Sequence, residues 1–192
     1  GLIQNWEFII SQQSCSKLNN IQKLRLGPLS SSRILENWLA ISKGDQLLVS
    51  EKDYRKLDPL KIAKQSNEGF ANSCKRWLYG EKDFKIDHFF IDNLFNNALL
   101  IDQFLDSRLK LKGSINEPAL ARWLPKLTSE KVSFMLSASS PIRDWLTFSG
   151  SMALKHKCFS FRGASGIDGT LSSAIGLSLI NTPTILVTGD LA

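Results

Sequence analysis

The stretch KCFSFRGASGIDG, from Lys157 to Gly169, decides the fold of this chain. Its first five residues are typical of a short strand, and the residues that follow Gly169 are typical of a helix rich in small side chains. Arg162 and three glycines therefore lie where a strand turns into a helix. Backbone amides and a guanidinium at such a turn are suited to hold an anion such as a diphosphate.

Two further apolar runs, residues 132–136 and 184–187, are separated from this strand by segments long enough for helices. This alternation predicts an α/β fold with a largely parallel sheet and helices on both faces. Ligands of such sheets bind at the carboxyl ends of the strands. The residues that follow the three strands are small, polar or charged: 137–140, 162–169 and 189–190.

The first part of the chain predicts a separate β-α-β unit. Residues 23–26 and 46–50 are expected to be strands, and residues 32–42 a helix that carries its apolar side chains largely on one face. Leu57-Asp58-Pro59 is expected to end this unit. The polar stretch 65–84 is expected to be a linker.

Two helices are expected between the linker and the second set of strands. In residues 85–111 apolar residues recur at helical spacing, which predicts a stripe that packs on a core; the stripe consists of Phe89, Leu94, Ala98, Ile101, Leu105 and Leu109. Residues 114–127 begin with Ser114 and Glu117, the spacing of a capping box.

Composition excludes several classes of protein. The 192 residues carry a net charge of +6, but the basic residues are dispersed among acidic ones, so nucleic-acid binding is not expected. No apolar run has the length of a membrane span. Cys15, Cys74 and Cys158 lie far apart and match no metal-binding spacing, which favours reduced thiols and a cytoplasmic protein.

The glycines of the central stretch leave two chemistries open. Gly163, Gly166 and Gly169 form a G-x-x-G-x-x-G pattern, which occurs in phosphate-binding turns and in ordinary structural turns. An acidic residue about 20 positions later is typical of nicotinamide-dependent oxidoreductases, and Asp190 has that position. Arg162 does not belong to that pattern, so this class is the alternative hypothesis.

The other two strand ends also allow two interpretations. Ser139 and Ser140 open a helix and can either cap it or face a ligand. Arg143 lies in the first turn of that helix, where the helix dipole disfavours a cation, which indicates an anionic partner: Asp144 or a substrate. Asp190 follows Gly189 and is either a turn residue or a magnesium ligand, since hard cations prefer carboxylate oxygens.

Taken together, these motifs resemble those of 2-succinyl-5-enolpyruvyl-6-hydroxy-3-cyclohexene-1-carboxylate synthases, the thiamine-diphosphate enzymes of menaquinone and phylloquinone synthesis. RGASGIDG is similar to a motif of that family, SSPIRD (139–144) to its N-S-x-P-[VI]-R-D element, and TGDLA (188–192) to its version of the G-D-G motif. The stretch from Gly27-Pro28 to Leu57-Asp58-Pro59 is similar to the second half of the family's middle domain.

The resemblance implies a partial thiamine-diphosphate-binding fold preceded by the end of a Rossmann-like middle domain. Residues 1–64 would be the C-terminal part of the middle domain, 65–84 the linker, and 85–192 the N-terminal part of the diphosphate-binding domain. The chain would thus be an internal part of a larger enzyme. It would contain no catalytic residue, and alone it would be inactive.

The resemblance also implies the reaction and its participants. The enzyme would decarboxylate 2-oxoglutarate and add the succinyl unit to isochorismate, as a homodimer or larger assembly with thiamine diphosphate and Mg²⁺, or Mn²⁺ in its place. Four residues would bind substrate: Ser139, Arg143, Arg162 and Arg33. Four would bind cofactor: Gly163, Ile167, Gly189 and Asp190, with Asp190 also the metal ligand. Phe161 and Ala138 stand where the family usually has asparagine.

Overall fold

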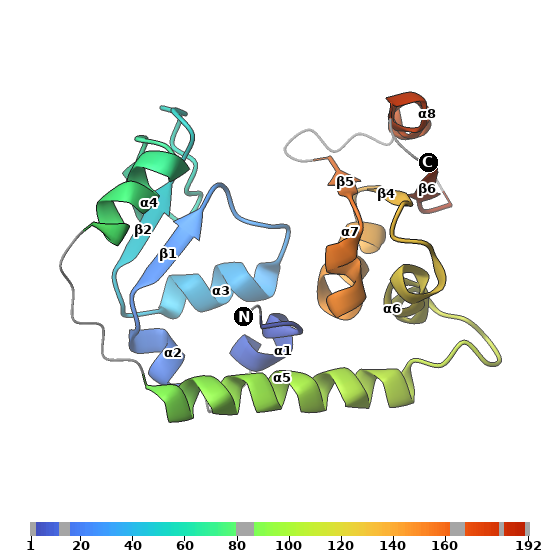
Figure 1. Ribbon diagram of the computed structural model, residues 1–192, viewed down its shortest axis with the longest axis horizontal. Helices are drawn as coiled ribbons and strands as arrows, with labels where there is room; N and C mark the ends of the chain where they lie inside the picture. The colour runs from blue at the N-terminus through green and yellow to red at the C-terminus, as the bar shows by residue number, and fades with distance from the viewer. Residues whose placement is uncertain (1–2, 12–15, 80–86, 162–167, 181–182, 191–192) are drawn as a thin grey trace. The chain divides into compact units, whose positions relative to one another are not determined.

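The computed structural model of the chain (Figure 1) describes residues 3–11, 16–79, 87–161, 168–180 and 183–190. Two compact units can be distinguished. One comprises Glu7–Leu94, and the other comprises Phe95–Ala192 together with Gly1–Trp6. Each unit is described by itself below.

The unit Glu7–Leu94 is built on a parallel sheet of three short strands in the order β1-β2-β3. Its elements are α1 (Trp6–Ser11), α2 (Ser16–Asn20), β1 (Lys23–Leu26), α3 (Arg33–Ile41), β2 (Gln46–Val49), β3 (Lys64–Ser66), α4 (Phe70–Leu78) and the start of α5 (His88–Arg108). The predicted β-α-β unit is confirmed by β1, α3 and β2. Helix α3 begins where predicted, because the Ser32 side chain accepts a hydrogen bond from the Leu35 amide at 3.1 Å.

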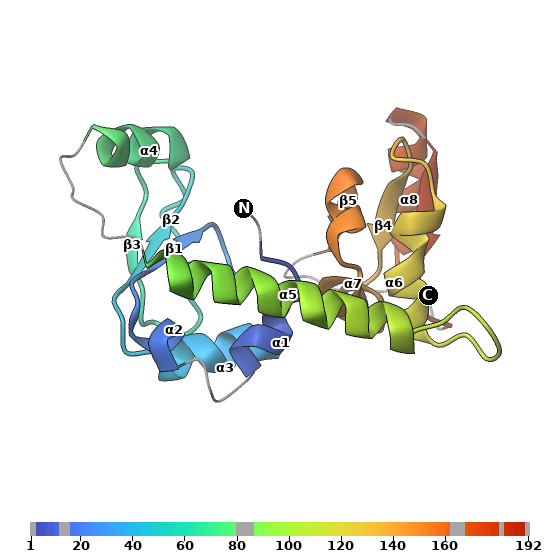
Figure 2. The ribbon, with the colours of Figure 1, turned by 60° about the horizontal axis from the view of Figure 1, so that its bottom comes forward.

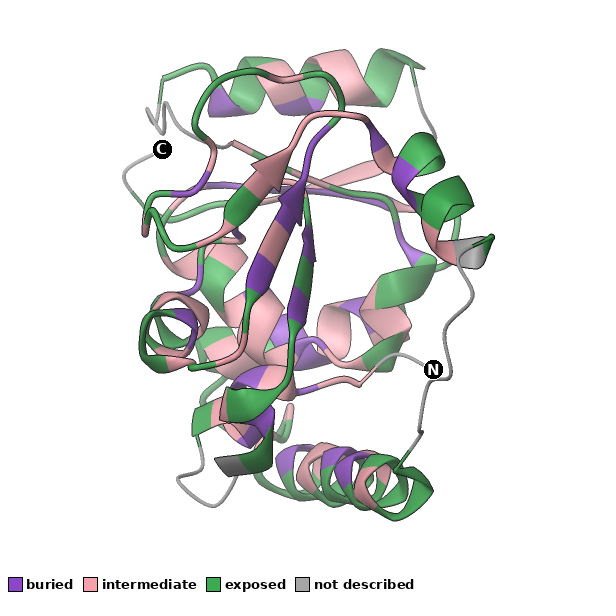
Figure 3. Ribbon diagram, turned by 90° about the vertical axis from the view of Figure 1, so that its left-hand side faces the viewer, coloured by how far each residue is buried: buried purple, intermediate pink, exposed green. Residues whose placement is uncertain are grey.

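Burial alternates along β1, as Figure 3 shows, but with the polar residues inside. Lys23 and Arg25 are buried, whereas Leu24 and Leu26 are exposed. The central strand β2 is buried along most of its length, with Leu48 and Val49 fully enclosed. The two neighbouring strands thus bury different kinds of side chain.

Part of the expected linker forms regular structure. Strand β3 pairs in parallel with β2, and α4 follows after Gly69. The unit therefore continues past Leu57-Asp58-Pro59, where the sequence predicted its end. Strand β3 lies at the edge of the sheet and α4 is largely exposed, so both have a polar composition. A linker is polar too, and composition alone therefore does not distinguish these two elements from a linker. The division of the chain into domains stays a prediction.

The second unit also has a three-stranded parallel sheet, in the order β5-β4-β6. It contains the rest of α5, then α6 (Glu117–Leu127), β4 (Ser133–Leu136), α7 (Ser140–Phe148), the 3-10 helix η1 (Ser151–Lys155), β5 (Cys158–Ser160), α8 (Thr170–Ile180) and β6 (Thr184–Val187). The three predicted strands, and the predicted α/β class with parallel sheets, are confirmed. Among the described residues, no helix has both the length and the apolar character needed to cross a membrane.

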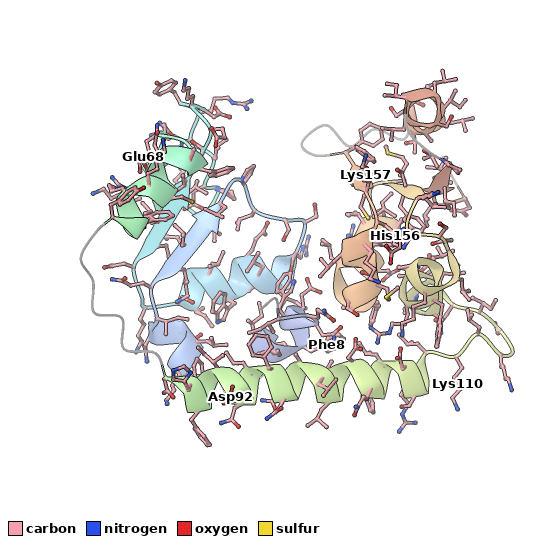
Figure 4. The ribbon with its side chains drawn as sticks, viewed as in Figure 1. Phe8, Glu68, Asp92, Lys110, His156 and Lys157 are labelled. Carbon is pink, nitrogen blue, oxygen red and sulfur yellow. The ribbon has the colours of Figure 1, made fainter. Side chains whose placement is uncertain are left out.

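The core of this unit forms around the central strand β4. Phe134 and Leu136 pack with Trp145 of α7, and the Phe134 and Trp145 rings lie 4.6 Å apart. His156, labelled in Figure 4, meets the Phe134 ring edge to face at 5.1 Å. Its two ring nitrogens lie 3.0 Å from the carbonyl oxygens of Val132 and Pro125. This core holds the sheet against α6 and α7.

Helix α5 runs without interruption from His88 to Arg108 (Figure 2). The predicted apolar stripe is confirmed for Leu94, Ala98 and Leu105, which are buried. It is wrong for Phe89, which is 77% exposed. Phe89 lies five positions before Leu94, and at about 100° per residue this places Phe89 well off the buried face.

The predicted capping box at Ser114 is also wrong. Asn116 caps α6, and its side chain accepts a hydrogen bond from the Ala119 amide at 2.9 Å. With Ser114 as the cap, Pro118 would occupy a position whose amide must donate within the helix, and proline has no amide hydrogen. The helix therefore begins at Glu117, which keeps Pro118 in the first turn.

Candidate functional site

A pocket of about 310 Å³ lies at the carboxyl ends of β4 and β6. The two strands are parallel neighbours, and the Ser137 amide donates a hydrogen bond to the Val187 carbonyl at 2.9 Å just past the end of the ladder. We call this the strand-end pocket. It is lined by Glu117, Leu120, Ala121, Ser137, Ala138, Ser139, Ser140, Pro141, Asp144, Trp145, Val187, Thr188, Gly189 and Asp190. Three predicted site residues, Ser139, Gly189 and Asp190, thus share one pocket.

Ser139 has an unusual backbone conformation at the mouth of α7. Its φ is 79° and its ψ is −134°, a region that residues other than glycine rarely adopt. The Ser139 side chain makes no capping hydrogen bond to α7, although the residue occupies the N-cap position. The interpretation of Ser139 as a helix cap is therefore wrong. Strained residues of this kind are frequent at ligand sites.

Arg143 lies on α7 but does not line the strand-end pocket. The residue is exposed, and the ion pairs of the described residues do not include it. Burial and the charge of Glu117 raise the pKa of Asp144, while the charge of Arg143 opposes this rise.

Asp190 and Gly189 form the other wall of the pocket. Asp190 is exposed directly after β6. A Cβ atom added at Gly189 would have no heavy atom of the described residues within 4 Å. Carboxylate and hydroxyl oxygens are the ligands that a hard cation prefers. In the described part of the chain, however, no three His, Cys, Asp or Glu residues lie close enough to hold a metal by themselves.

Four other predicted site residues are not part of this pocket's described lining. Arg162, Gly163 and Ile167 lie outside the described residues. Arg33 is the first residue of α3 in the other unit, where it is exposed. Next to it, Ser32 donates a hydrogen bond to Glu7.

Sequence reasoning missed the pocket role of two acidic residues. The sequence predicts a capping box for Glu117 and offers Asp144 as one of two possible partners of Arg143, yet both residues line the strand-end pocket with Asp190. The sequence did hold one indication that these two residues lie at the pocket. They belong to α6 and α7, the helices that come just before and just after strand β4 in the chain. The pocket is therefore more acidic in its described part than the motifs predicted.

A buried arginine, also missed, holds the helices that line this pocket. Arg122 of α6 is 0% exposed and donates to Asp106 and Asp102 at 2.7 Å each. It also donates to the carbonyl of Phe148, the last residue of α7, at 3.3 Å. Burial raises the pKa of Asp106, but hydrogen bonds from Arg122 and Lys126 lower it by more, so this pKa lies below its ordinary value. Nothing in the sequence pattern predicted this burial, because the acidic partners Asp102 and Asp106 lie on another helix.

The two parallel sheets and their helices make this an α/β protein, and a serine, a glycine and a carboxylate are gathered at adjacent strand ends of one sheet. In proteins of this class, ligands generally bind at the carboxyl ends of the strands. No protein-family model matches the chain. Curated proteins of similar sequence are named 2-succinyl-5-enolpyruvyl-6-hydroxy-3-cyclohexene-1-carboxylate synthase. Those of Prochlorococcus marinus strains MIT 9303 and MIT 9515 are 44% and 47% identical over 200 and 197 residues. That of Synechococcus sp. strain CC9605 is 46% identical over 190 residues.

These alignments cover 99–100% of this chain and 32–34% of each of the three relatives. The chain therefore belongs by sequence to the family of these synthases, and the predicted family is confirmed. The chain spans about a third of the length of the curated relatives it matches.

Proposed function

We propose that the protein is a thiamine-diphosphate-dependent transferase that decarboxylates 2-oxoglutarate and joins the remaining four-carbon succinyl unit to isochorismate. The names of its relatives support the product of this reaction. The observation that carries the proposal is that Ser139, Gly189 and Asp190 share the strand-end pocket. In this proposal the protein acts in menaquinone or phylloquinone synthesis in the cytoplasm, as a homodimer or larger assembly, and this chain alone is inactive.

The residues around Asp190 fit a magnesium-bound diphosphate. Asp190 would give a carboxylate oxygen to Mg²⁺ or Mn²⁺, and the diphosphate oxygens would complete the ligand set. Gly189 would let the diphosphate approach the backbone, because none of the described residues occupies the space where a side chain would lie. Gly163 and Ile167 would contact the cofactor from the segment that follows β5. Thiamine diphosphate, when bound, supplies the electron sink for the loss of carbon dioxide from 2-oxoglutarate.

The chain's own side chains would bind and orient the two substrates, each of which carries two carboxylates. Arg143, Arg162 and Arg33 would pair with these carboxylates, since a guanidinium offers two parallel donors. Ser139 would donate from its hydroxyl, which is not used to cap α7. Burial and the charge of Glu117 raise the pKa of Asp144 in this pocket, and the charge of Arg143 opposes the rise.

Calorimetric titration tests this proposal against the nicotinamide alternative. We expect thiamine diphosphate with Mg²⁺ to bind at least about tenfold more tightly than NADH, and removal of Mg²⁺ to abolish that binding. Asp190→Asn should weaken thiamine-diphosphate binding by about tenfold or more, whereas Asp92→Asn on α5 serves as a matched control without effect. Tighter binding of NADH, or equal binding by the Asp190 variant, would overturn the assignment.

A further inference from the structure

His156 lies directly after η1 and is 7% exposed, in the core of the unit that contains β4 (Figure 4). Its Nδ1 atom lies 3.0 Å from the Val132 carbonyl oxygen, and its Nε2 atom lies 3.0 Å from the Pro125 carbonyl oxygen. A carbonyl oxygen accepts hydrogen bonds and has no hydrogen to donate. The His156 ring therefore connects the last part of α6 with the residue that precedes β4.

These two contacts favour one protonation state of the ring. A neutral imidazole carries one N–H group, so it can donate to one carbonyl and turns a lone pair toward the other. The doubly protonated ring donates from both nitrogens and satisfies both carbonyls. A buried carbonyl that is left without a donor is costly, so the geometry favours the charged ring.

The position of His156 at the end of α6 also favours a positive charge. Pro125 is one of the last four residues of α6, whose carbonyl oxygens have no amide partner within the helix. The Leu124 carbonyl accepts a hydrogen bond from the Thr128 hydroxyl at 2.8 Å, and the Pro125 carbonyl faces His156. Because the C-terminal end of a helix carries a partial negative charge, it stabilises a cation at this place.

Other charged or titratable groups lie on the elements around His156. They are Arg122 and Lys126 of α6, Asp102 and Asp106 of α5, Glu130 and Lys131 of the turn before β4, Arg143 and Asp144 of α7, and the flanking Lys155, Lys157 and Cys158. The two cations of α6 pair with the two carboxylates of α5. Lys131, Arg143 and Lys157 are exposed, so water and salt screen their charges. Burial raises the pKa of the Cys158 thiol to about 11, so this side chain stays neutral.

Glu130 is a neighbour that interacts with a charge on His156. Lys155 donates a hydrogen bond to Glu130 at 2.7 Å. This bond and the charge of Lys155 lower the pKa of Glu130, and the charge of His156 lowers it further. The attraction between Glu130 and the protonated ring is mutual. Because the Glu130 side chain is 61% exposed, this attraction is weak beside the two carbonyl contacts.

We propose that His156 is a proton-dependent clamp that holds the end of α6 against the start of β4. The clamp is complete while both ring nitrogens carry a proton, and it loses one hydrogen bond as the pH rises through the range in which histidine side chains titrate. Both elements lead to the strand-end pocket, which Leu120 and Ala121 line from α6 and Ser137 lines after β4. The clamp thus sets how firmly two walls of that pocket are joined. The proposal does not depend on the reaction proposed above.

NMR of the unaltered, ¹⁵N-labelled chain tests the protonation state first. Long-range ¹H–¹⁵N spectra show whether each ring nitrogen carries a proton, and the exposed His88 is the internal reference. We expect both His156 nitrogens to be protonated at about pH 5 and one of them to have lost its proton at about pH 8. A ring nitrogen of His156 that carries no proton even at about pH 5 would overturn the proposal.

Hydrogen exchange of the same sample tests the clamp. The Val132 amide donates to the Ser129 carbonyl and the Phe134 amide donates to the Lys157 carbonyl, both close to the clamp. After correction for the intrinsic effect of pH, we expect these amides to exchange about three- to tenfold faster at about pH 8 than at about pH 5, the effect of one lost hydrogen bond. The Ser50 amide of the first sheet is the control and should show no such change. Equal corrected rates at the two pH values would overturn the proposal.

Two variants then assign the effect to His156. A glutamine amide donates from a single nitrogen and does not titrate, so His156→Gln should show fast exchange of the Val132 and Phe134 amides at both pH values. His88→Gln changes an exposed histidine and should keep the response of the unaltered chain. Circular dichroism checks that each variant is folded, and the spectra of the unaltered chain decide the matter if His156→Gln is not. A pH response that persists in a folded His156→Gln protein would contradict the proposal.

Discussion

Arg25 in the first sheet and Arg122 beneath the strand-end pocket are both buried, but their charges are compensated differently. Arg25 of β1 pairs with Asp58 at 2.9 Å, and both side chains are less than 10% exposed. The Nε and Nη2 atoms of Arg25 have no partner in the described part of the chain. Arg122 uses all three of its nitrogens, and its partners Asp102 and Asp106 keep 26% and 38% exposure.

The difference shows what each arginine depends on. Asp58 is the sole described carboxylate partner of Arg25 and also accepts hydrogen bonds from the amides of Ile62 and Ala63. Arg122 instead spreads its charge over two carboxylates that water can still reach, and over two carbonyls. A buried ion that loses its only partner is far more costly than a pair whose survivor can be hydrated. The first sheet is therefore expected to be more sensitive to a single substitution.

The largest expected effect is that of Asp58→Ala. This change leaves Arg25 buried without any described hydrogen-bond acceptor and frees the backbone amides of Leu60, Ile62 and Ala63, so the free energy of unfolding should fall by about 3–5 kcal/mol. Arg25→Met is the matched control and should cost only about 1–3 kcal/mol, because Asp58 keeps its amide donors. Urea unfolding measures both. A greater loss for Arg25→Met would reverse the comparison.

Low pH should weaken the same ion pair of Arg25 and Asp58. Burial raises the pKa of Asp58, but hydrogen bonds from the Ala63 amide, Arg25 and the Ile62 amide lower it by more, so its folded pKa is depressed. Its contribution to stability is then fully present above the unfolded pKa of about 3.9 and is lost as the pH falls below it. We expect Asp58→Asn to flatten the dependence of stability on pH between about pH 5 and pH 2.

Arg122→Met should have the next largest effect and lower the free energy of unfolding by about 2–3 kcal/mol. The loss is smaller than for Asp58→Ala because Asp102 and Asp106 remain partly hydrated. The Phe148 carbonyl at the end of α7 also loses a donor. Urea unfolding monitored by tryptophan fluorescence measures the change, and a loss equal to that of Asp58→Ala would contradict the argument from exposure.

Gly150→Ala tests the space around Arg122 more gently. Gly150 has a φ of 70°, and an added Cβ would lie 2.3 Å from Arg122 Nη1. Gly113 has a φ of 86°, but no heavy atom of the described residues lies within 4 Å of such a Cβ. We expect the free energy of unfolding, measured by thermal unfolding, to fall by about 2 kcal/mol for Gly150→Ala and by about 1 kcal/mol for Gly113→Ala. The Gly113 variant carries the backbone strain without the clash. Equal losses would mean that Arg122 moves without cost.

The smallest effect is expected for an ion pair outside both cores. Arg55 pairs with Asp53 at 2.7 Å, with the Arg55 side chain 83% exposed. Hydrogen bonds from Arg55 lower the pKa of Asp53 to about 2. Asp53→Asn should nevertheless leave the unfolding midpoint unchanged, since exposed pairs contribute little. NMR titration of the wild-type carboxyl gives the pKa, and a clear loss of stability in the variant would show that exposure is a poor guide here.

The sequence predicted the elements that depend on local pattern. The strands at 133–136, 158–160 and 184–187 are confirmed, because continuous apolar runs between helix-length segments are typical of parallel strands. Strand β3 was missed, because an edge strand as polar as Lys64–Ser66 carries no hydrophobic period. Ser139, Gly189 and Asp190 could be placed at one edge because parallel strands end together.

Features that depend on tertiary contacts could not be predicted from the sequence pattern. Neither the positive φ of Ser139 nor the burial of Arg25 and Arg122 follows from residue type, since arginine is usually exposed and serine usually caps. Those features depend on partners far along the chain, such as Asp58 for Arg25 and Asp106 for Arg122. The roles of Arg33, Arg143, Arg162, Gly163 and Ile167 stay predictions.

The most direct test of the strand-end pocket as the cofactor site uses Mn²⁺ as a paramagnetic probe. Mn²⁺ and thiamine diphosphate are titrated together into the ¹⁵N-labelled chain, and the broadening of each amide signal reports its distance from the metal. We predict that Gly189 and Ser139 broaden first, and that Asp190→Asn abolishes this whereas Asp92→Asn does not. Broadening centred elsewhere, or unchanged in the Asp190 variant, would contradict the account.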